Sequence, residues 1–418
     1  MAEIKPFKAL RYTQKAGTIS ECCCPPYDII SAKEKEEYLA RNPHNIIKLE
    51  LPGTEYADYE KAAATLDGWL ESGVLAEDDC ESIYAYEEAF SVAGKEYSFR
   101  GIVCRVKLYD FSENVVLPHE ETLSKAKEDR FCLMNATGCN ISQIYSLYND
   151  KEGATARTVG AATQGAPENE FTDAAGVTHR MWRITDADAI SDICEQFRDR
   201  KLYIADGHHR YETALRYKKS VYGRGDSGYV MMFLIDMEND GLVVFPTHRI
   251  IRGIENFDTA ALLAAASENF TVEKLASKDE FGQKLSEGYE AHKKVFGFYD
   301  GSEAYLLTLK NEEAMKKAMP NASDALKGLD VSVLHTLLLE QVLGIDKENM
   351  AKQINLTYTR DEAEAIAAAE GDCNACFIIN PTRVDEIAAV AAAGEKMPQK
   401  STYFYPKLIT GLVMNKIF

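Results

Sequence analysis

Apolar and polar residues alternate in short blocks along the chain, and their period changes repeatedly between that of a strand and that of a helix. Near the N-terminus, Ser31 and Glu34 have the spacing of a capping box, which predicts a helix to about residue 40. A second helix is expected over 56–71. Residues 82–86 and 96–109 alternate and carry β-branched and aromatic residues, as paired strands do.

The next segments continue this mixed pattern. An apolar stretch at 115–117 meets a proline and gives way to a helical pattern that runs to residue 134. Residues 150–170 are rich in Gly, Ala, Thr and Asn with weak periodicity, which predicts a surface excursion. Further elements are expected as a strand at 180–184, a helix at 187–197, a strand at 202–205, and a hairpin of 229–236 with 242–247 through the turn 238–241.

After about residue 252 helices and strands alternate again. Helices are expected at 262–267, 278–291, 331–343, 362–370 and 385–393, and strands at 295–299, 305–310 and 375–380. A chain of 418 residues is too long for one ordinary core. We therefore expect an α/β (α+β) protein with an N-terminal α/β region at 1–110, a core at 111–255 and a C-terminal α/β domain at 256–418.

Charge and composition narrow the class of partner. The net charge is −19, and no dense basic stripe offsets it, which argues against nucleic acid and membrane surfaces as partners. The longest apolar run, around 230–235, is far shorter than the roughly 20 residues of a membrane helix. The first residues lack the apolar core of a signal peptide, so the expected compartment is the cytoplasm, and a homo-oligomer is left open.

Ten cysteines without an export signal are expected to be reduced thiols. Cys22, Cys23 and Cys24 are consecutive, which makes joint coordination of one metal ion awkward. Cys373 and Cys376 have zinc-like spacing, but no second pair accompanies them. Small apolar core residues are the favoured interpretation at both places, with metal binding as the alternative.

The segment 202–214 carries the strongest chemical signal. It predicts a strand, a tight loop at Asp206–Arg210 and a helix start. Unpaired N–H groups and the macrodipole make a helix N-terminus attractive to anions, and Gly207 lets a ligand approach the backbone. His208, His209 and Arg210 add donors, so we predict a phosphate or metal-phosphate site. The alternative is that the two histidines cap the helix or satisfy a buried hydrogen bond. Downstream, Tyr211, Ala214 and Leu215 have helical spacing and are expected to anchor the helix.

Five strings in the chain resemble one prokaryotic family, the family of unknown function 1015. They are Pro25-Pro-Tyr-Asp28, Leu117-Pro-His-Glu120, Ala205–Ala214, Pro246-Thr-His-Arg249 and Ser401–Lys407. The resemblance extends over nearly the whole chain. It implies no activity by itself.

A more distant resemblance does imply an activity. The Asp206–Arg210 loop and the upstream Pro118-His119-Glu120 are similar to motifs in small free-serine kinases of the ParB/sulfiredoxin-like fold. It implies a ParB/sulfiredoxin-like core that transfers phosphate from ATP, ADP or pyrophosphate, with Mg²⁺, to the hydroxyl of a small metabolite, free serine leading. Glu120 is then the catalytic base, and Asp206–Arg210 bind the phosphates. The two motifs are farther apart here than in the small kinases.

The residue types suit this chemistry. Phosphoryl transfer to an alcohol requires positioning, cations around the transferred group and a carboxylate for the hydroxyl proton. Asp206 beside a glycine suits Mg²⁺, which prefers one or two carboxylates plus phosphate. Lys127 and Arg130 either point to the same anion or, as we favour, are solvated helix charges paired with Glu128 and Asp129.

Further substrate-binding candidates are Asp28, His119, Thr247, His248 and Arg249. Asp28 follows a rigid Pro-Pro-Tyr entry, which aims a carboxylate or closes a turn. His248 and Arg249 follow an apolar strand at a point where loops carry function, although Arg249 could instead pair with a nearby acid. The aromatic stretch at 403–407 is expected to pack an interface rather than line a ligand cleft.

Other functions fit less well. A nucleotide-binding regulator of the ParB-like fold without catalysis is the main alternative. A DNA-partition role conflicts with the acidic charge and the missing basic helix-turn-helix. A sulfiredoxin-like reductase would need a reactive cysteine where this chain has His208, so no thiolate nucleophile is in place.

Overall fold

The computed structural model describes residues 2–120, 122, 124–222 and 224–418. The chain folds into two compact units. Unit 1 comprises Met1–Pro118, Thr122–Val243 and Pro406–Phe418, and unit 2 comprises His119–Glu121 and Val244–Tyr405. This division differs from the expected three parts, because the first 110 residues share one sheet with residues 116–236 and the last residues return to unit 1.

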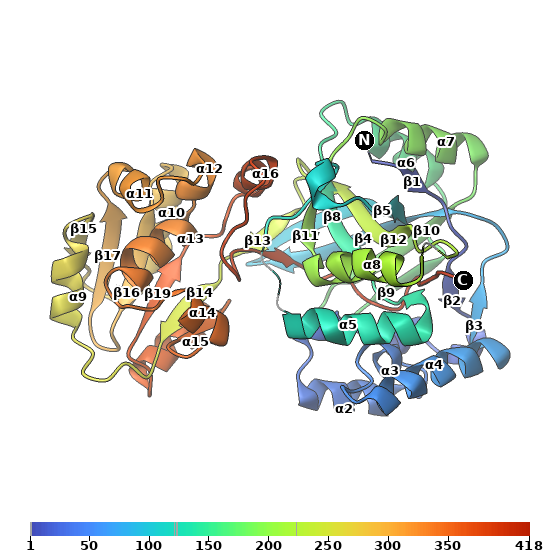
Figure 1. The fold of residues 1–418 in the computed structure, drawn as a ribbon, viewed down its shortest axis with the longest axis horizontal. Helices are drawn as coiled ribbons and strands as arrows, with labels where there is room; N and C mark the ends of the chain where they lie inside the picture. The colour runs from blue at the N-terminus through green and yellow to red at the C-terminus, as the bar shows by residue number, and fades with distance from the viewer. Residues whose placement is uncertain (1, 121, 123, 223) are drawn as a thin grey trace. The chain divides into compact units, whose positions relative to one another are not determined.

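Unit 1 is built on a nine-stranded mixed sheet with the order β6-β11-β8-β12-β5-β4-β10-β9, in which β1 also pairs with β5 (Figure 1). The pairs β11–β6 and β12–β8 are parallel, and the other pairs are antiparallel. Its strands are β1 (Ile4–Lys5), β4 (Ile83–Val92), β5 (Lys95–Lys107), β6 (Val116–Leu117), β8 (Ile144–Tyr148), β9 (Asn169–Thr172), β10 (Thr178–Ile184), β11 (Leu202–Asp206) and β12 (Tyr229–Asp236). Two small ribbons pair β2 (Leu10–Tyr12) with β3 (Leu75–Glu77) and β7 (Cys139–Asn140) with β21 (Asn415–Lys416).

The helices of unit 1 pack on this sheet, and some of them also form a second hydrophobic core. They are α1 (Ile19–Cys22), α2 (Ala32–Arg41), α3 (Ile47–Glu50), α4 (Tyr56–Glu71), α5 (Ser124–Thr137), α6 (Ala154–Ala162), α7 (Ala187–Gln196) and α8 (His208–Ser220). Because strand side chains alternate, Val230, Met232 and Leu234 of β12 face one way and pack with Phe197 and Tyr211. The predicted capping box is confirmed, since Ser31 and Glu34 exchange both hydrogen bonds at the start of α2.

Two expectations for unit 1 were wrong. Residues 150–170 contain α6, which packs against α7 and buries Val159, so this segment is more than a surface excursion. The hairpin of 229–236 with 242–247 does not form. Both edges of β12 are taken by β5 and β8, and β13 (Val243–Phe245) pairs instead with β20 (Tyr403–Tyr405).

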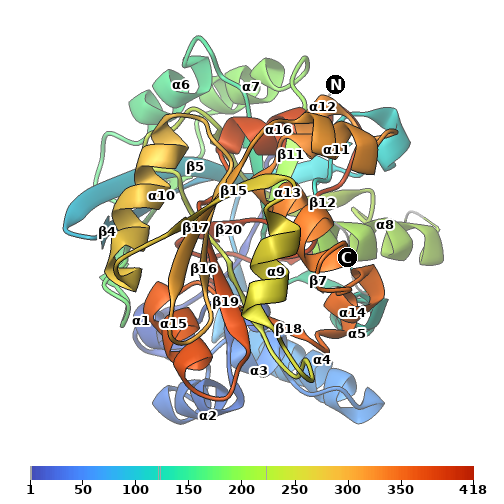
Figure 2. The same cartoon turned by 90° about the vertical axis from the view of Figure 1, so that its left-hand side faces the viewer.

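Unit 2 contains a six-stranded antiparallel sheet with the order β15-β17-β16-β19-β14-β18 (Figure 2). Its strands are β14 (His248–Ile251), β15 (Phe270–Lys274), β16 (Val295–Tyr299), β17 (Ala304–Leu309), β18 (Leu356–Thr359) and β19 (Ala375–Ile379). Helices α10 (Phe281–Glu290) and α15 (Glu362–Glu370) bury Phe281, Leu285 and Ala365 against it. Most of the strands and helices expected after residue 252 are confirmed to within a few residues.

The remaining α-helices of unit 2 have nine residues or fewer, and one of them leads into a segment of unusual geometry. They are α9 (Thr259–Ala266), α11 (Glu313–Ala318), α12 (Asp324–Lys327), α13 (Asp330–Val333), α14 (Lys347–Lys352) and α16 (Val384–Ala392). Helix α13 continues directly into a π-helix, η5 (Leu334–Glu340). Such i→i+5 segments are rare and occur frequently at functional sites.

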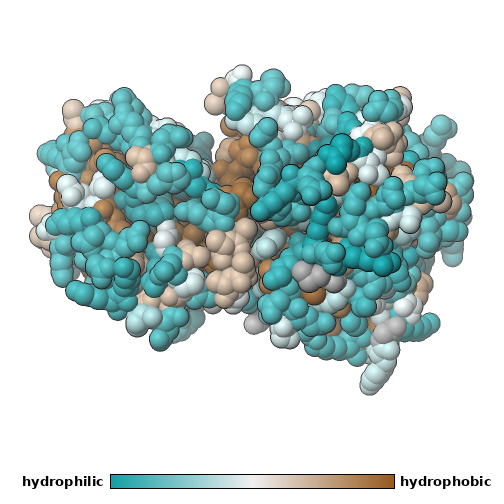
Figure 3. Space-filling model, turned by 90° about the horizontal axis from the view of Figure 1, so that it is seen from above, coloured by the Kyte–Doolittle hydropathy of each residue, from teal (hydrophilic) through white to brown (hydrophobic). Residues whose placement is uncertain are grey.

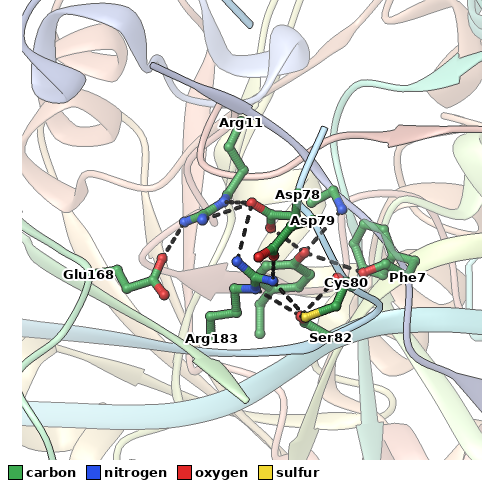
Figure 4. A network of polar contacts seen from close by, with 10 residues as sticks. Phe7, Arg11, Asp78, Asp79, Cys80, Ser82, Glu168 and Arg183 are labelled. Atoms are coloured by element: carbon green, nitrogen blue, oxygen red, sulfur yellow. Dashed lines mark hydrogen bonds and ion pairs between the residues drawn. The ribbon is translucent and has the colours of Figure 1, made fainter. Parts of the chain in front are cut away.

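A partly buried polar network ties the first strands of unit 1 to its sheet (Figure 4). Asp78, just after β3, accepts hydrogen bonds from Arg11 of β2 at 2.9 Å and from the Tyr84 hydroxyl of β4 at 2.6 Å. Arg11 also pairs with Glu168 at 2.6 Å, and Arg183 of β10 reaches Asp79. These hydrogen bonds and ion pairs therefore connect β2, β4 and β10 through the two aspartates that follow β3.

Hydrophilic side chains cover most of the face of each unit seen in Figure 3. In the part of the chain that the structure describes, no helix has the length and apolar character needed to span a membrane. Cys22, Cys23 and Cys24 are buried, and burial raises the pKa of each thiol, that of Cys22 to about 11. Cys376 is buried and Cys373 partly so.

Candidate phosphate-binding site

The predicted strand, loop and helix at 202–214 are present in unit 1. Strand β11 ends at Asp206, and α8 begins at His208. Between them Gly207 has φ 92° and ψ 27°, the left-handed conformation that favours glycine. A Cβ at this position would lie 2.9 Å from Nε of Arg210. The backbone conformation therefore favours glycine, and any side chain here would displace the Arg210 guanidinium.

Two cations hold the Asp206 carboxylate. Lys407 donates to Oδ1 at 2.5 Å and Arg210 donates to Oδ2 at 2.7 Å. Arg210 also donates to the Gln143 carbonyl. Burial alone would raise the pKa of Asp206, but the Lys407 ammonium and the Arg210 guanidinium outweigh it and hold the pKa well below its usual range. Asp206 thus holds the Arg210 guanidinium and the Lys407 ammonium in fixed positions beside the loop.

Helix α8 is anchored as the sequence predicts. The Tyr211 hydroxyl donates to the Tyr109 carbonyl at 2.8 Å and accepts from the Tyr109 N–H at 3.0 Å. Tyr211 and Ala214 are buried, and Leu215 packs against the same core. His208 is buried and His209 is partly exposed at the first turn. The N-terminus of a 13-residue helix is therefore fixed firmly beside Asp206.

The predicted magnesium ligand is already engaged. Each carboxylate oxygen of Asp206 lies in an ion pair, one with Lys407 and the other with Arg210. A carboxylate that holds two cations is not open to Mg²⁺, which needs carboxylate oxygens in its own shell. Among residues 2–120, 122, 124–222 and 224–418, no group of three His, Cys, Asp or Glu is placed to hold a metal ion. The donor set at Asp206 does not fit Mg²⁺ as arranged here.

The two candidate cations of α5, Lys127 and Arg130, have different partners and different burial. Lys127 pairs with Glu212 of α8 at 2.8 Å rather than with Glu128, which pairs with Arg216. Arg130 is buried, so it is not a solvated charge. It pairs with Asp129 at 2.6 Å and lies 3.7 Å from the buried Glu50.

Arg130 and Arg210 meet in a small cavity of about 40 Å³ in unit 1, which Glu50 and Ser142 also line. Burial raises the pKa of Glu50, although Arg130 and Arg210 oppose this. Arg130 lies 4.0 Å above the ring of Tyr27. Asp28, next to that ring, is exposed in a single 3₁₀ turn. The structure therefore brings the Pro-Pro-Tyr segment toward the loop through Tyr27 and not through a buried Asp28.

The other candidates lie in unit 2. His119 is buried, its Nε2 lies 3.0 Å from Thr402 Oγ1, and its carbonyl accepts from Met397 N–H at 2.7 Å. The backbone of Glu120 forms an isolated parallel β-bridge with Met397. The Oε1 of Glu120 accepts a hydrogen bond from the Lys400 N–H at 2.9 Å. Backbone groups of residues 397–400 thus fix the predicted base.

Arg249 lies near the same segment. It is fully buried and donates to the carbonyls of Thr247 and Lys400 and, at 3.2 Å, to Nε2 of His335. Burial lowers the pKa of Arg249 to about 10, while Tyr358 and Glu120 act in the opposite direction. Lys400 therefore connects two predicted residues, because its N–H binds Glu120 and its carbonyl binds Arg249.

His248 has its contacts outside the segment 397–400, while the Thr247 carbonyl accepts from Arg249 as described above. His248 Nδ1 accepts from Ile379 N–H at 3.2 Å, and burial lowers the pKa of His248 to about 4. It lines an open hollow of about 400 Å³ with Arg360 and Tyr289. Thr247 is buried. In the stretch 403–407, Tyr403 and Tyr405 stack on Phe245, as the packing interpretation predicts.

Sequence reasoning missed Lys407, His335 and Glu50. Lys407 lies in a string whose aromatic residues indicate packing, and its position directly after Tyr-Pro is the only available signal. Nothing in the local pattern of Glu50 or His335 distinguishes either from an ordinary helix residue.

Comparisons with known proteins place the chain as follows. A family model described as protein of unknown function (DUF1015) matches residues 4–332. No curated protein matches the chain significantly. Among solved structures, a conserved hypothetical protein from Pyrococcus furiosus is 16% identical, with 76% of this chain and 97% of that chain covered and a TM-score of 0.36.

Two further solved structures are similar at the same level. A free serine kinase in complex with AMP is 14% identical, with 76% and 93% of the two chains covered and a TM-score of 0.38. SbnI with C-terminal truncation, from Staphylococcus aureus, is 11% identical, with 74% and 87% covered and a TM-score of 0.35. These TM-scores are too low to assign a function, which therefore depends on the residues of the site.

Proposed function

The chain belongs to the family described as protein of unknown function (DUF1015), and we propose that it is a phosphotransferase. In this proposal a phosphoryl group moves from a nucleotide, ATP or ADP, or from pyrophosphate, to the hydroxyl of a small metabolite. Free serine is the leading acceptor, as the motif resemblance implies. The compartment we expect is the cytoplasm.

The loop at Asp206–Arg210 is the observation that carries the proposal. It combines the N-terminus of a 13-residue helix, a left-handed glycine and two cations held on one carboxylate. Helix N–H groups and guanidinium groups are the donors that proteins use for phosphate oxygens. Asp206 keeps Arg210 and Lys407 in place before a ligand arrives, which reduces the ordering cost of binding.

The proposed chemistry has two tasks, charge stabilisation and proton removal. The acceptor oxygen attacks the terminal phosphorus, the bond from that phosphorus to the bridging oxygen breaks, and the nucleotide leaves one phosphate shorter. The cations of the loop stabilise charge on the transferred group. The motif resemblance assigns removal of the hydroxyl proton to Glu120, whose carboxylate accepts the N–H of Lys400 within unit 2.

Phosphorus NMR tests the activity directly. ATP, ADP and pyrophosphate are each incubated with a panel of hydroxy amino acids, and we expect a new phosphomonoester signal with one donor and L-serine. Absence of any phosphomonoester with all three donors would contradict the proposal.

Variants then test the two assignments separately. Glu120→Gln should keep nucleotide binding by calorimetry and lose turnover by about a hundredfold to ten-thousandfold, whereas the exposed Glu348→Gln should not change turnover. Arg210→Ala should weaken nucleotide binding, with Arg216→Ala, on the same helix but paired at the surface with Glu128, as its control. Equal nucleotide affinity in Arg210→Ala and wild type would remove the loop from the site.

The second candidate is a nucleotide-binding regulator without catalysis. The pre-oriented loop favours it equally, because the loop needs only a phosphate and no acceptor. Nucleotide binding by calorimetry without any phosphomonoester product would select this alternative.

A further inference from the structure

Unit 2 encloses a cavity of about 130 Å³ that none of the residues predicted from the sequence lines. An engineered apolar cavity of about 150 Å³ holds a benzene molecule. The volume in unit 2 therefore suits a ligand of comparable size, far smaller than a nucleotide.

The π-helix η5 supplies one wall of this cavity. Ser332 of α13 and His335, Thr336 and Glu340 of η5 all line it. Bonds from residue i to i+5, such as Gln341 N–H to Thr336 carbonyl at 3.3 Å, place residues five apart nearly above one another. The π-helix thus turns Glu340 to the same side as His335, which a regular α-helix would not do.

The inner part of the cavity is uncharged but polar. His335 is 4% exposed, and its Nε2 accepts from Arg249, so its ring proton sits on Nδ1. Burial lowers the pKa of His335 well below its ordinary value, with the Arg249 charge adding to this, so the ring stays neutral. The buried hydroxyl of Ser332 has no hydrogen-bond partner among the described residues. Such a group is rare in a folded core and calls for a partner.

Apolar groups surround these polar ones. Met319, Met350 and Leu326 line the cavity from α14 and from the segment around α11 and α12. Methionine side chains adapt to ligands of different shape. The inner part therefore accepts a short side chain that is apolar or carries one hydroxyl.

Charges of both signs stand at the outer part of the lining. Glu340 is partly exposed, and Lys347 and Lys396 are exposed. Glu340 and Lys347 line the same cavity; burial raises the pKa of Glu340, and the Lys347 ammonium opposes this. A ligand with an ammonium and a carboxylate on one end would match this arrangement.

We propose that the cavity is a binding site for a free amino acid with a short, uncharged side chain. The ligand's ammonium pairs with Glu340, its carboxylate faces Lys347 and Lys396, and its side chain lies beside Ser332, His335 and the methionines. The site belongs wholly to unit 2 and is separate from the phosphate loop, so it goes beyond the proposed transfer reaction.

Methyl-labelled methionine gives a local readout in the full-length protein. The probes are L-serine, L-threonine, L-valine and L-methionine, added without nucleotide and followed in carbon–proton spectra. We expect saturable shifts of the Met319 and Met350 methyl signals, assigned from Met319→Leu and Met350→Leu, with at least one probe. The signals of Met181 and Met231, buried in unit 1, should stay in place.

Charge requirements provide the second half of the test. Ethanolamine lacks the carboxylate and 3-hydroxypropionate lacks the ammonium, and each should bind at least about tenfold more weakly than L-serine. Glu340→Gln should weaken amino-acid binding similarly, whereas Glu348→Gln, whose carboxylate pairs with Lys352 outside the cavity, should not.

Three outcomes would overturn the inference: no shift at Met319 or Met350 with any probe, a truncated analogue that binds as tightly as L-serine, or unchanged amino-acid affinity in Glu340→Gln. Because nucleotide is absent throughout, failure of the transfer reaction does not affect these measurements. A protein that phosphorylates serine yet shows no shift at these methionines would retain the proposed function and lose this site.

Discussion

Gly207 is the position where backbone conformation and the candidate chemistry coincide most closely. Its left-handed φ lets β11 turn into α8 within a single residue, and the missing side chain leaves room for Arg210. Other single residues are held by their partners: Asp206 of unit 1 pairs with two cations, and Glu120 of unit 2 accepts a backbone N–H.

Gly207→Ala should weaken nucleotide binding as measured by calorimetry, because its Cβ would push the Arg210 guanidinium from its place. Gly176→Ala is a matched control, since Gly176 has a similar φ of 82° but no atom lies within 4 Å of the position that its Cβ would take. Both substitutions should cost about 1–2 kcal/mol of stability from the left-handed conformation. Equal nucleotide affinity in both variants would show that Arg210 does not need this space.

A buried histidine should make stability depend on pH. Burial alone would lower the pKa of His179, but hydrogen bonds and charges of Asp173 and Glu88 outweigh it and raise the pKa to about 9. Since this lies above the unfolded value of about 6.5, the contribution is fully present below about pH 6.5 and is lost as pH rises through about 9.

Urea unfolding of the wild type should therefore show a loss of about 2–3 kcal/mol from this group between pH 6.5 and 9. His179→Gln should lack this slope, and the exposed His292→Gln should retain it. A wild-type slope that survives in His179→Gln would assign the effect to another group.

At the scale of helices and strands, the pattern of hydrophobic residues predicts most elements because each is set by local period. The helix at 56–71 and the strand at 295–299 have the expected bounds. The hairpin expected at 229–247 failed because strand pairing is decided by which edges are free, and β5 and β8 occupy both edges of β12. Local signals cannot report such competition.

The residues of the candidate site likewise divide into those that local sequence predicts and those that distant contacts bring together. The loop at 206–210 was predictable because strand, glycine and helix start are adjacent in sequence. Lys407 was not, since it reaches Asp206 across 201 positions. The π-helix also escaped prediction, because its residues read as an ordinary buried helix.

The polar network of Figure 4 supplies a test at this scale. Asp78→Ala should destabilise unit 1 by about 1–3 kcal/mol, because Arg11 and the Tyr84 hydroxyl both lose a hydrogen bond to a largely buried carboxylate. Asp79→Ala should cost much less, since Asp79 pairs with Arg183 but is 84% exposed. Similar losses in urea unfolding for the two neighbours would contradict the importance of burial here.

At the scale of the whole molecule, residues 406–418 belong to unit 1 although they follow unit 2 in sequence. Unit 2 is inserted between residues 243 and 406 of unit 1, after which the chain pairs with residues near its beginning: Thr410 with Cys24 and Met414 with Leu10. Lys407 lies in this returning segment.

Lys407→Met should lower stability by about 1–3 kcal/mol, because the largely buried Asp206 carboxylate keeps its ion pair with Arg210 but loses the one with Lys407. The pKa of Asp206 should rise, which a carbon NMR titration of its carboxyl would detect. The exposed Lys352→Met, which loses only a surface pair with Glu348, is the control. An unchanged Asp206 titration in Lys407→Met would contradict the assigned ion pair.

The pair between Asp206 and Lys407 also sets an order of events during synthesis. Translation delivers Asp206 and Arg210 to the folding chain well before Lys407, so the loop at 206–210 lacks this second cation until residue 407 has left the ribosome. A message that terminates after residue 405 would yield a protein with both units nearly complete in sequence and a loop that lacks its second cation.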